Sequence, residues 1–378
     1  MTVDTPYEFV GGFPTAETIA AAYDAADYVR AVTCYKHFFP AVSGMTILSG
    51  TQAVGVVPNR SFGTMDTRPG QIGFTLNSDT PYAPILLDLA SGPLVVTIPP
   101  GAIVGAALNA DQSWISDMGI PGPDAGHGGT HIFIGPAGYD GDLPDGSFTH
   151  TTLGSRVVVG LRAIPQGGDV DAAIALLRSV HVEPLRADDQ WQPPTWVDLT
   201  GRPQDTTPPA VQGTLEYWKV LPDHISTEPV HPDDRSYVGE LAVLGIRADT
   251  PFTPDERLTR ILTNAAQDAD AQLRVQSLAD RRAARVVWPD RHWEWVTLRR
   301  ENAACGIDGR PGGDARETWF YRAIASSPVM FRRQAGTGSL YWFTARDATG
   351  SYLDGARSYR LRVPLPVPAG LFWSLTVY

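Results

Sequence analysis

Two stretches of the chain carry residue types and spacings that are suited to acid–base chemistry. The first is the segment 77–82, Asn-Ser-Asp-Thr-Pro-Tyr, and the second contains Asp111 and Trp114. In an extended segment alternate side chains point to the same face, so Asn77 and Asp79 share one side. If the fold brings Asp79 and Asp111 together, the two carboxylates can serve as general acid and general base.

These residues predict an enzyme with paired carboxylates, a hydrolase or lyase acting on a glycan or another small polar molecule. The predicted catalytic residues are Asp79, Asp111 and Tyr82. The predicted substrate-binding residues are Asn77, Thr80, Trp114, His131, Arg322 and Trp373, with Trp114 as a platform for a sugar ring. No metal or cofactor is predicted. The structural alternative is that Asp79 binds backbone amides in an Asx-turn while Tyr82 fills the core.

A third stretch, which contains two histidines, allows two interpretations. His127 and His131 are four residues apart, and Asp124 lies nearby. On a helix this spacing would place both imidazoles on one side, as in a zinc site. The glycines at 126, 128 and 129 disfavour a helix. We therefore favour a mobile glycine-rich loop that leads into a strand at 131–134 and borders a pocket.

Two features near the end of the chain also have alternative roles. Arg322 falls on a candidate helix, where it either pairs with Asp354 inside a second sandwich or clamps the carboxylate of a substrate. The segment 288–295 holds three tryptophans among charges of both signs. It could stack on a sugar or an aromatic ligand, but a junction between a helical insert and the second sandwich, or a subunit interface, is the favoured interpretation.

Several well-known catalytic motifs are absent from the sequence. There is no Gly-x-Ser-x-Gly elbow, phosphate-binding glycine loop, dinucleotide fingerprint or Cys-x-x-Cys pair. These absences argue against classical serine hydrolases, nucleoside-triphosphate enzymes, Rossmann dehydrogenases and zinc ribbons.

The bulk composition limits the partners and the compartment. The 378 residues are enough for about two domains. A net charge of −11 disfavours nucleic acid and anionic membranes as partners. No apolar stretch approaches the ~20 residues that cross a bilayer, and residues 1–10 lack the pattern of a signal peptide. We expect a cytoplasmic protein.

Helical periodicity appears in several segments. The first predicted helix spans 15–37, ends before Pro40, and packs one face against a core; that face contains Ile19, Ala22, Tyr23, Ala26, Val29 and Thr33. Asp169 caps a predicted helix through 179, and a linker follows at 186–209. Further predicted helices cover 211–221, 232–244, 253–280 (with Thr253 as N-cap) and 315–325.

Short apolar runs bounded by turn residues dominate the rest of the chain. Between 52 and 161 these runs predict an antiparallel sandwich or barrel, because no helical crossovers separate them. Strands are predicted again at 339–346, at 359–363 and at 371–378. In the second of these, Tyr359, Leu361 and Val363 alternate with arginines, which is typical of a strand with one buried face.

Two groups of motifs resemble a known tandem of domains. The first, Leu76-Asn77-Ser78-Asp79-Thr80-Pro81-Tyr82 with 87–89 and 92–95, is similar to the domain of unknown function numbered 1254. The second, 321–323, 341–343, 352–355 and 372–376, is similar to the partner domain numbered 1214. The resemblance implies two jelly-roll-like sandwiches with helices between them, similar to double jelly-roll virus coat proteins, and a homo-oligomer. It implies no particular activity.

The predicted fold is therefore mainly β with a helical insert (α+β), built on two jelly-roll-like antiparallel β-sandwiches. The predicted parts are an N-terminal helical segment (1–50), a first sandwich (51–168), a helical insert and linker (169–285) and a second sandwich (286–378). The alternative to an enzyme is a non-catalytic ligand-binding module or a capsid-like oligomeric assembly module.

Overall fold

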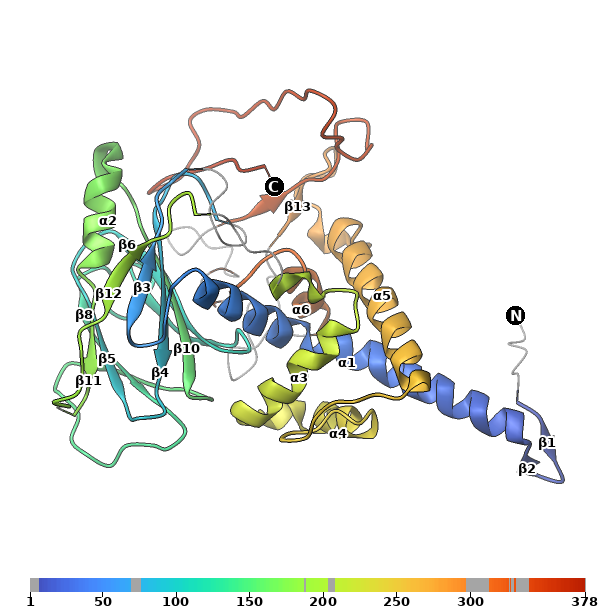
Figure 1. Cartoon of the computed structure of the whole chain (residues 1–378). Coiled ribbons are helices and arrows are strands. Elements are labelled where there is room, and N and C mark those ends of the chain that lie inside the picture. Colours follow the sequence, from blue (N-terminus) through green and yellow to red (C-terminus); the bar gives the residue numbers. More distant parts are fainter. Residues whose placement is uncertain are drawn as a thin grey trace.

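The computed structural model describes residues 7–68, 76–186, 188–202, 208–296, 313–325, 327, 330 and 340–377. Figure 1 shows a β-sandwich beside a layer of helices, with the long helix α1 running from one to the other. The α+β class is thus as predicted. Helical residues outnumber strand residues among those described, so the prediction of a mainly β chain was wrong in its balance.

The sandwich consists of two four-stranded sheets. The first has the order β4 (Tyr82–Asp88), β10 (Arg156–Ala163), β6 (Ile103–Asn109) and β7 (Trp114–Gly119). The second has the order β11 (His181–Pro184), β5 (Leu94–Ile98), β8 (Gly129–Ile134) and β9 (Phe148–Thr151). All neighbours are antiparallel except β8 and β9, which are parallel.

Alternation along the strands gives the first sheet two buried faces. Val157, Val159 and Leu161 of β10 pack between the sheets in the sandwich core. Val158 and Leu86 instead face a smaller cluster that includes Leu48 of α1. The first sheet therefore lies between the second sheet on one side and the end of α1 on the other.

Smaller elements flank the sandwich. β3 (Ser61–Thr64) pairs in parallel with β12 (Thr195–Asp198), and α2 (Val170–Arg178) begins at the predicted cap Asp169. At the N-terminus β1 (Phe9–Val10) and β2 (Phe13–Pro14) form a short hairpin. Single 3-10 turns occupy Gln166–Gly168, Pro208–Val211, Pro232–Asp234 and Ala283–Arg285.

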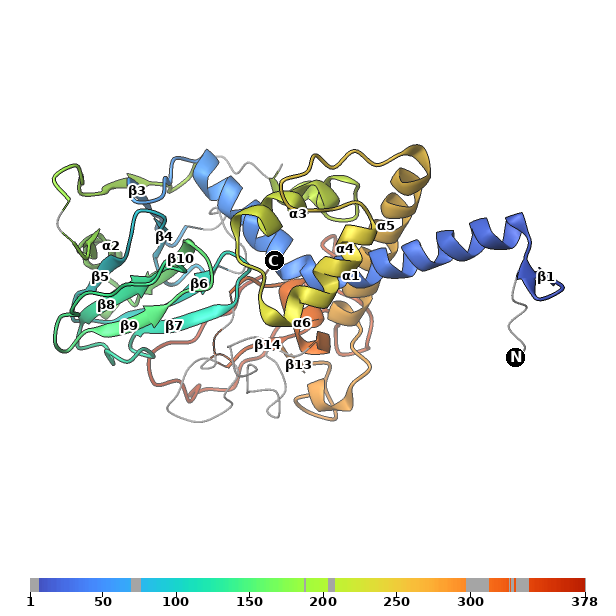
Figure 2. The same cartoon turned by 90° about the horizontal axis from the view of Figure 1, so that it is seen from below.

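The helical layer surrounds α1 (Ala16–Ala53). It contains α3 (Glu216–Thr227), α4 (Arg235–Val243), α5 (Glu256–Leu278) and α6 (Gly313–Phe320), which share one apolar core with α1. The predicted N-terminal segment is thus part of the same layer as the helices α3, α4 and α5 of the predicted insert, whereas α2 and β11 of that insert belong to the sandwich (Figure 2). None of the helices in the described part of the chain is long and apolar enough to span a membrane.

Helix α1 continues well beyond its predicted end. Pro40 was expected to stop it, because proline lacks a backbone N–H and removes one intrahelical hydrogen bond. The helix runs through Pro40 to Ala53, and the residues on either side of the proline, Phe39 and Ala41, are buried. Burial of this long apolar segment against both layers outweighs the lost hydrogen bond.

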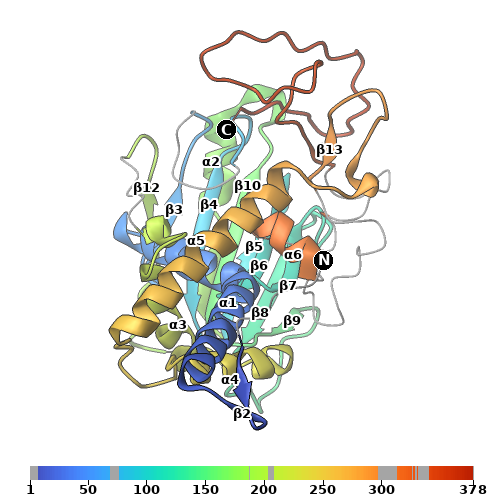
Figure 3. The same cartoon turned by 90° about the vertical axis from the view of Figure 1, so that its right-hand side faces the viewer.

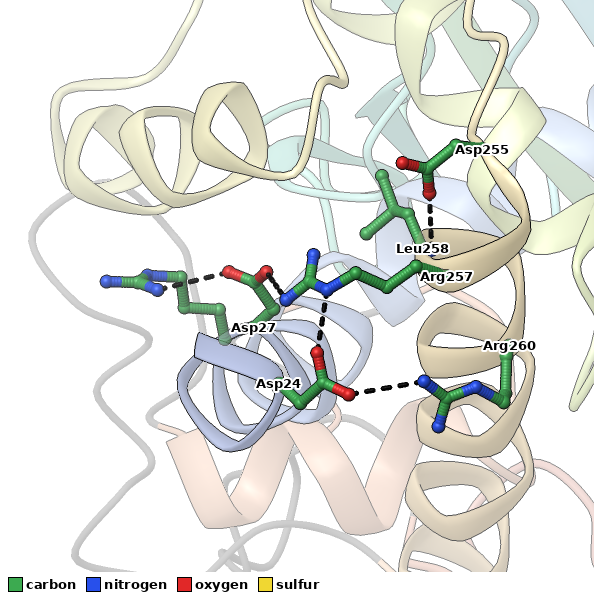
Figure 4. A network of polar contacts seen from close by, with 7 residues as sticks. Asp24, Asp27, Asp255, Arg257, Leu258 and Arg260 are labelled. Atoms are coloured by element: carbon green, nitrogen blue, oxygen red, sulfur yellow. Dashed lines mark hydrogen bonds and ion pairs between the residues drawn. The ribbon is translucent and has the colours of Figure 1, made fainter. Parts of the chain in front are cut away.

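A charge network fixes the crossing of α5 over α1 (Figures 3 and 4). The Arg257 Nε donates to the Asp24 Oδ1 at 2.6 Å, and its Nη2 donates to the Asp27 Oδ2 at 2.8 Å. Arg260 donates to the second Asp24 oxygen at 3.2 Å. Helix α5 begins later than predicted, because Asp255 rather than Thr253 caps it.

The second predicted sandwich is not present in the described residues. The C-terminal part contributes only β13 (Glu294–Trp295) and β14 (Trp342–Phe343), which pair with each other. Residues 344–377 contain turns and one isolated bridge, between Arg346 and Tyr352, but no ladder, and the face predicted to be buried, Tyr359, Leu361 and Val363, is exposed. Alternation predicts a strand only where a neighbouring strand supplies backbone partners, and the described residues supply none here.

Gly44 allows the sandwich to approach α1, which generates a test of this packing. A Cβ at residue 44 would lie 2.4 Å from the backbone oxygen of Ala110. We expect Gly44→Ala to lower the free energy of unfolding by about 1–3 kcal/mol, despite alanine's better helix propensity. The matched control is Gly239→Ala on α4, where the new Cβ meets nothing within 4 Å, so that stability should rise by about 1 kcal/mol at most. Urea unfolding followed by circular dichroism measures both; equal effects at the two sites would contradict the close approach.

Candidate functional site

The segment around Asn77 forms a turn just before β4. The Asn77 Oδ1 accepts hydrogen bonds from the backbone N–H groups of Asp79 and Thr80, both at 2.9 Å, and from the Thr80 hydroxyl at 3.0 Å. Its Nδ2 donates to the Tyr82 hydroxyl at 2.9 Å. An Asx-turn is present, as in the structural alternative, but Asn77 makes it and Asp79 is exposed.

The strand register separates Asp79 from Asp111. The first residue of β4 pairs with Arg162 of β10, whereas the last residue of β6 pairs with Val157 at the other end of β10. At about 3.3 Å per residue, these positions are about 17 Å apart. Because Asp79 precedes β4 and Asp111 follows β6, the two carboxylates leave the sheet at opposite ends. Their predicted pairing was wrong.

The turn between β6 and β7 holds Asp111 in a buried polar setting. The Asp111 Oδ1 accepts from the Ser113 backbone N–H at 2.9 Å and from the Ser113 hydroxyl at 2.6 Å. The neighbouring Asn109 Oδ1 accepts from the Leu153 N–H at 2.9 Å. Asp111 is only 8% exposed, and its two bonds with Ser113 fix the direction of its carboxylate.

Gln112, the next residue, ties this turn to the helical layer. Its backbone has a φ of 65°, in the left-handed region, and its side chain is buried. The Gln112 Nε2 donates to the Pro40 carbonyl oxygen, and its Oε1 accepts from the Ala325 N–H, both at 2.9 Å. The turn that carries Asp111 is thereby bound both to α1 and to the segment after α6.

A small cavity lies where this turn meets the helical layer. Its volume of about 20 Å³ is sufficient for one water molecule. Three carboxyl-bearing side chains line it, those of Asp111, Glu228 and Asp234, together with the imidazole of His224. Asp111, one of the two carboxylates named from the sequence, thus lies at this cavity, and the other two acidic residues there come from the helical layer.

Glu228 follows α3 and lies against the end of β10. The Nε of Arg156 donates to its Oε1, and a Cβ on Gly154 would lie 1.5 Å from its Oε2. Burial raises the pKa of Glu228, the neighbouring charge of Asp111 adds to the increase, and Arg156 partly opposes it. Glu228 is thus a carboxyl group that holds its proton to a higher pH than usual.

A larger cleft of about 260 Å³ lies next to this pair. Arg156 lines it, as do Asp88 and Asp223, and Arg156 Nη1 is 3.6 Å from the Asp223 carboxylate. Residues of α1 and the first sheet complete the wall, among them Ser49 and Gln52. Arg156 therefore connects the water-sized cavity, through Glu228, with a space large enough for a small molecule.

Sequence reasoning missed most of this junction. Glu228 lies between the helices predicted at 211–221 and 232–244, and Arg156 fell within the predicted strand region between 52 and 161. Neither belongs to a motif, and they meet only because the start of β10 lies beside the end of α3. Trp114, predicted to bind substrate, starts β7 half-buried and lines neither cavity, and Trp373 is 50% exposed on the C-terminal extended segment.

Arg322 does not pair with Asp354. Its Nε donates to the Ser277 hydroxyl at 2.7 Å, and its guanidinium lies 4.3 Å from the ring centroid of Phe343. Asp354 is exposed and pairs with Arg357 at 3.6 Å. The predicted pair was wrong, because the C-terminal residues that the structure describes form no sandwich around it. Burial lowers the pKa of Arg322 to about 10; its role as a substrate clamp stays a prediction.

The tryptophan-rich segment 288–295 includes β13 and packs against β14. The rings of Trp288 and Trp295 lie edge-on to that of Trp342, with centroids 5.0 and 6.0 Å apart. These rings pack on one another within the chain; a junction with a second sandwich or a subunit interface stays a prediction.

His131 lies inside the sandwich. It is fully buried on β8, and its Nδ1 is 3.0 Å from the Nε2 of His150 on β9. Its Nε2 is 3.4 Å from an oxygen of Asp124, also buried. His127 is exposed, and no group of side chains in the described residues has the arrangement of a metal site. His131 lines neither of the two cavities described above, because the strand turns it inward; its role in substrate binding stays a prediction.

Comparisons with known proteins agree with the tandem expected from the motifs. Residues 60–184 match the family described as Protein of unknown function (DUF1254), and residues 338–378 match Protein of unknown function (DUF1214). The crystal structure of the VPA0106 protein from Vibrio parahaemolyticus is similar in fold, with a TM-score of 0.56 and 13% identity over 88% of this chain and 74% of that chain. At that identity the likeness concerns the fold alone. No curated protein matched the chain.

The pair formed by the buried His131 and the half-buried His150 predicts a loss of stability in acid. Burial lowers the pKa of His131 and of His150 from 6.5 to about 4. Between about pH 6.5 and pH 4 the unfolded chain therefore binds more protons than the folded one, and the free energy of unfolding falls, by roughly 3 kcal/mol for each histidine. The raised pKa of Asp124 acts in the opposite direction.

A comparison of variants isolates the histidine effect. His131→Leu should lose roughly 3 kcal/mol less between pH 7 and pH 4 than the parent chain. His181→Gln, at an exposed histidine on β11, is the control and should keep the parent slope. Denaturant unfolding at each pH gives the numbers; parallel curves for the parent and His131→Leu would exclude this source of acid sensitivity.

Proposed function

We propose that the chain is an enzyme, a hydrolase of a small polar molecule such as a glycan, with its reaction centre at the junction of sandwich and helical layer. The observation that supports this most directly is the pairing of two buried carboxyl groups, Asp111 and Glu228, in one water-sized cavity beside a larger cleft. General acid–base hydrolysis needs two carboxyl groups in different protonation states, with a water molecule between them and the substrate.

The environments of the two groups suggest their roles. Glu228, whose pKa is raised by burial, would donate a proton to the leaving oxygen of the substrate. Asp111, held by two donors from Ser113, would take a proton from the water molecule that attacks the substrate. Arg156 would hold Glu228 in place and face the substrate in the larger cleft. The proton taken by Asp111 must return to Glu228 before the next turnover.

Substitution of the pair is the principal test. Glu228→Gln and Asp111→Asn should each lower kcat/KM by at least ~100-fold on whichever member of a panel of chromogenic aryl glycosides and esters the parent chain cleaves. Melting temperatures should stay within a few degrees of the parent. Asp79→Asn is the matched control, since Asp79 is exposed at the far end of the sheet.

The possible results separate the competing roles. Loss of activity in Asp79→Asn but not in Glu228→Gln would return the site to the turn around Asn77. Elimination without consumption of water would identify a lyase. An inactive parent chain that nevertheless binds panel members in the cleft would favour the non-catalytic binding module. For either role we propose that the strands have the jelly-roll arrangement that the resemblance implies.

A second test moves Glu228 without changing it. The Cβ of Gly154→Ala would occupy the position of the Glu228 Oε2, so that the carboxyl group must leave the cavity. We expect a loss of activity comparable to that of Glu228→Gln. Gly160→Ala on the same β10 strand is the control, because its Cβ meets nothing within 4 Å and should leave activity unchanged. Full activity in Gly154→Ala would show that Glu228 is not required.

A further inference from the structure

One face of α1 that should be covered is exposed. The sequence predicts that Ile19, Tyr23 and Val29 pack against a core, as the apolar stripe of an amphipathic helix does. In the structure these three side chains are 45%, 65% and 62% exposed. The described part of this chain therefore does not cover the stripe.

The stripe belongs to an arm that extends from the body of the molecule. Figures 1 and 2 show the β1–β2 hairpin and the first turns of α1 beyond the other helices. We call residues 7–26 the N-terminal arm. The hairpin is also apolar and exposed, with Phe9, Val10 and Phe13 at 58%, 66% and 76%. The arm thus presents a continuous series of large apolar side chains to its surroundings.

The spacing of the stripe is symmetric. Ala16, Ile19, Tyr23 and Ala26 follow one another at intervals of three, four and three residues. These are the a and d positions of two heptads, the spacing with which two helices pack side by side. Read from either end, the order of sizes is small, large, large, small. An antiparallel copy of the same helix therefore meets the same spacing and the same sizes.

We propose that the N-terminal arm pairs antiparallel with the N-terminal arm of a second copy of this chain, about a two-fold axis. In this register Ile19 packs against Tyr23 of the second copy, and Ala16 against Ala26. The alanines allow the two helices to approach closely. On the N-terminal side of the helix, Phe13 of the hairpin then lies beside the turn of helix α1 in the second copy that contains the exposed Val29. A two-fold axis makes each contact occur twice.

The acidic residues of the arm do not oppose this pairing. Asp24 and Asp27 are engaged by Arg257 and Arg260 of α5 on another side of the helix (Figure 4). Glu17 occupies the same heptad position as Asp24 and points away from the seam. The arm itself carries Glu8, Glu17 and Asp24 and no lysine or arginine, so an anionic lipid surface is a poor occupant. A second arm is not repelled at the seam, because Glu17 and Asp24 share an outer heptad position.

The available area is sufficient for a weak to moderate dimer. Phe9, Val10, Phe13, Ile19 and Tyr23 are each about half exposed or more. At roughly 100 Å² for each such side chain, one arm offers about 500 Å² and the pair about 1,000 Å². That total is at the lower limit of specific interfaces. The proposal is independent of the reaction centre, because the arm and the junction cavity share no residue.

The oligomeric state of the full chain tests the pairing. Sedimentation velocity over micromolar concentrations should show a monomer–dimer equilibrium. The double variant Ile19→Glu with Tyr23→Glu should raise the dimer Kd at least ~100-fold, because both copies lose two central contacts. Val275→Glu, at an exposed valine on α5, is the matched control and should leave the Kd unchanged. Circular dichroism verifies that each variant keeps its helices.

Cysteine cross-linking tests the direction of the two arms. A mixture of Ile19→Cys chains and Tyr23→Cys chains should, under mild oxidation, form the mixed disulfide in preference to either self-linked species. A preference for self-linked species would overturn the antiparallel register. A parent chain that stays monomeric at every concentration would overturn the proposal, and so would a monomer whose arm binds neutral phosphatidylcholine vesicles.

Discussion

The contact between the β6–β7 turn and helix α1 is the constraint on which the arrangement of the molecule depends. Gly44 permits the backbone of the turn to touch the helix, and the left-handed Gln112 turns its amide toward Pro40. The same amide binds Ala325 through its oxygen. One buried side chain thus joins elements from three distant parts of the sequence, and the residue before it is Asp111.

This contact explains why a polar site can exist at a junction between two layers. The sandwich and the helical layer each have their own apolar core, and the contact holds them together without merging those cores. Between them lie the buried Glu228 and the half-buried Arg156, which bind each other. This pairing offsets part of the cost of burying the carboxyl group. The low polarity of the surroundings changes proton affinity there more than it would at the surface.

The sequence was informative wherever local rules decide the structure. The strands around β4, β5 and β10, the cap of α2 and the tandem motifs all follow from alternation, capping and turn chemistry. The course of α1 beyond Pro40 was not predictable, since the packing that overrides the proline comes from residues far along the chain. The same is true of the site: Asp111 could be identified as a candidate, but the register that separates it from Asp79 and the packing that brings Glu228 to it are tertiary.

The residues that contact α1 lie far from it in the sequence, and this separation has a consequence for the order of folding. The strands of the sandwich, from β4 to β11, come from one continuous segment, whereas Arg30 and Tyr28 of α1 contact residues more than two hundred positions later, Glu240 and Asp268. Closing such loops costs entropy before any contact compensates for it. We therefore expect the sandwich to fold first, on its own. Helix α1 should pack into its final position only when the last third of the polypeptide folds against it.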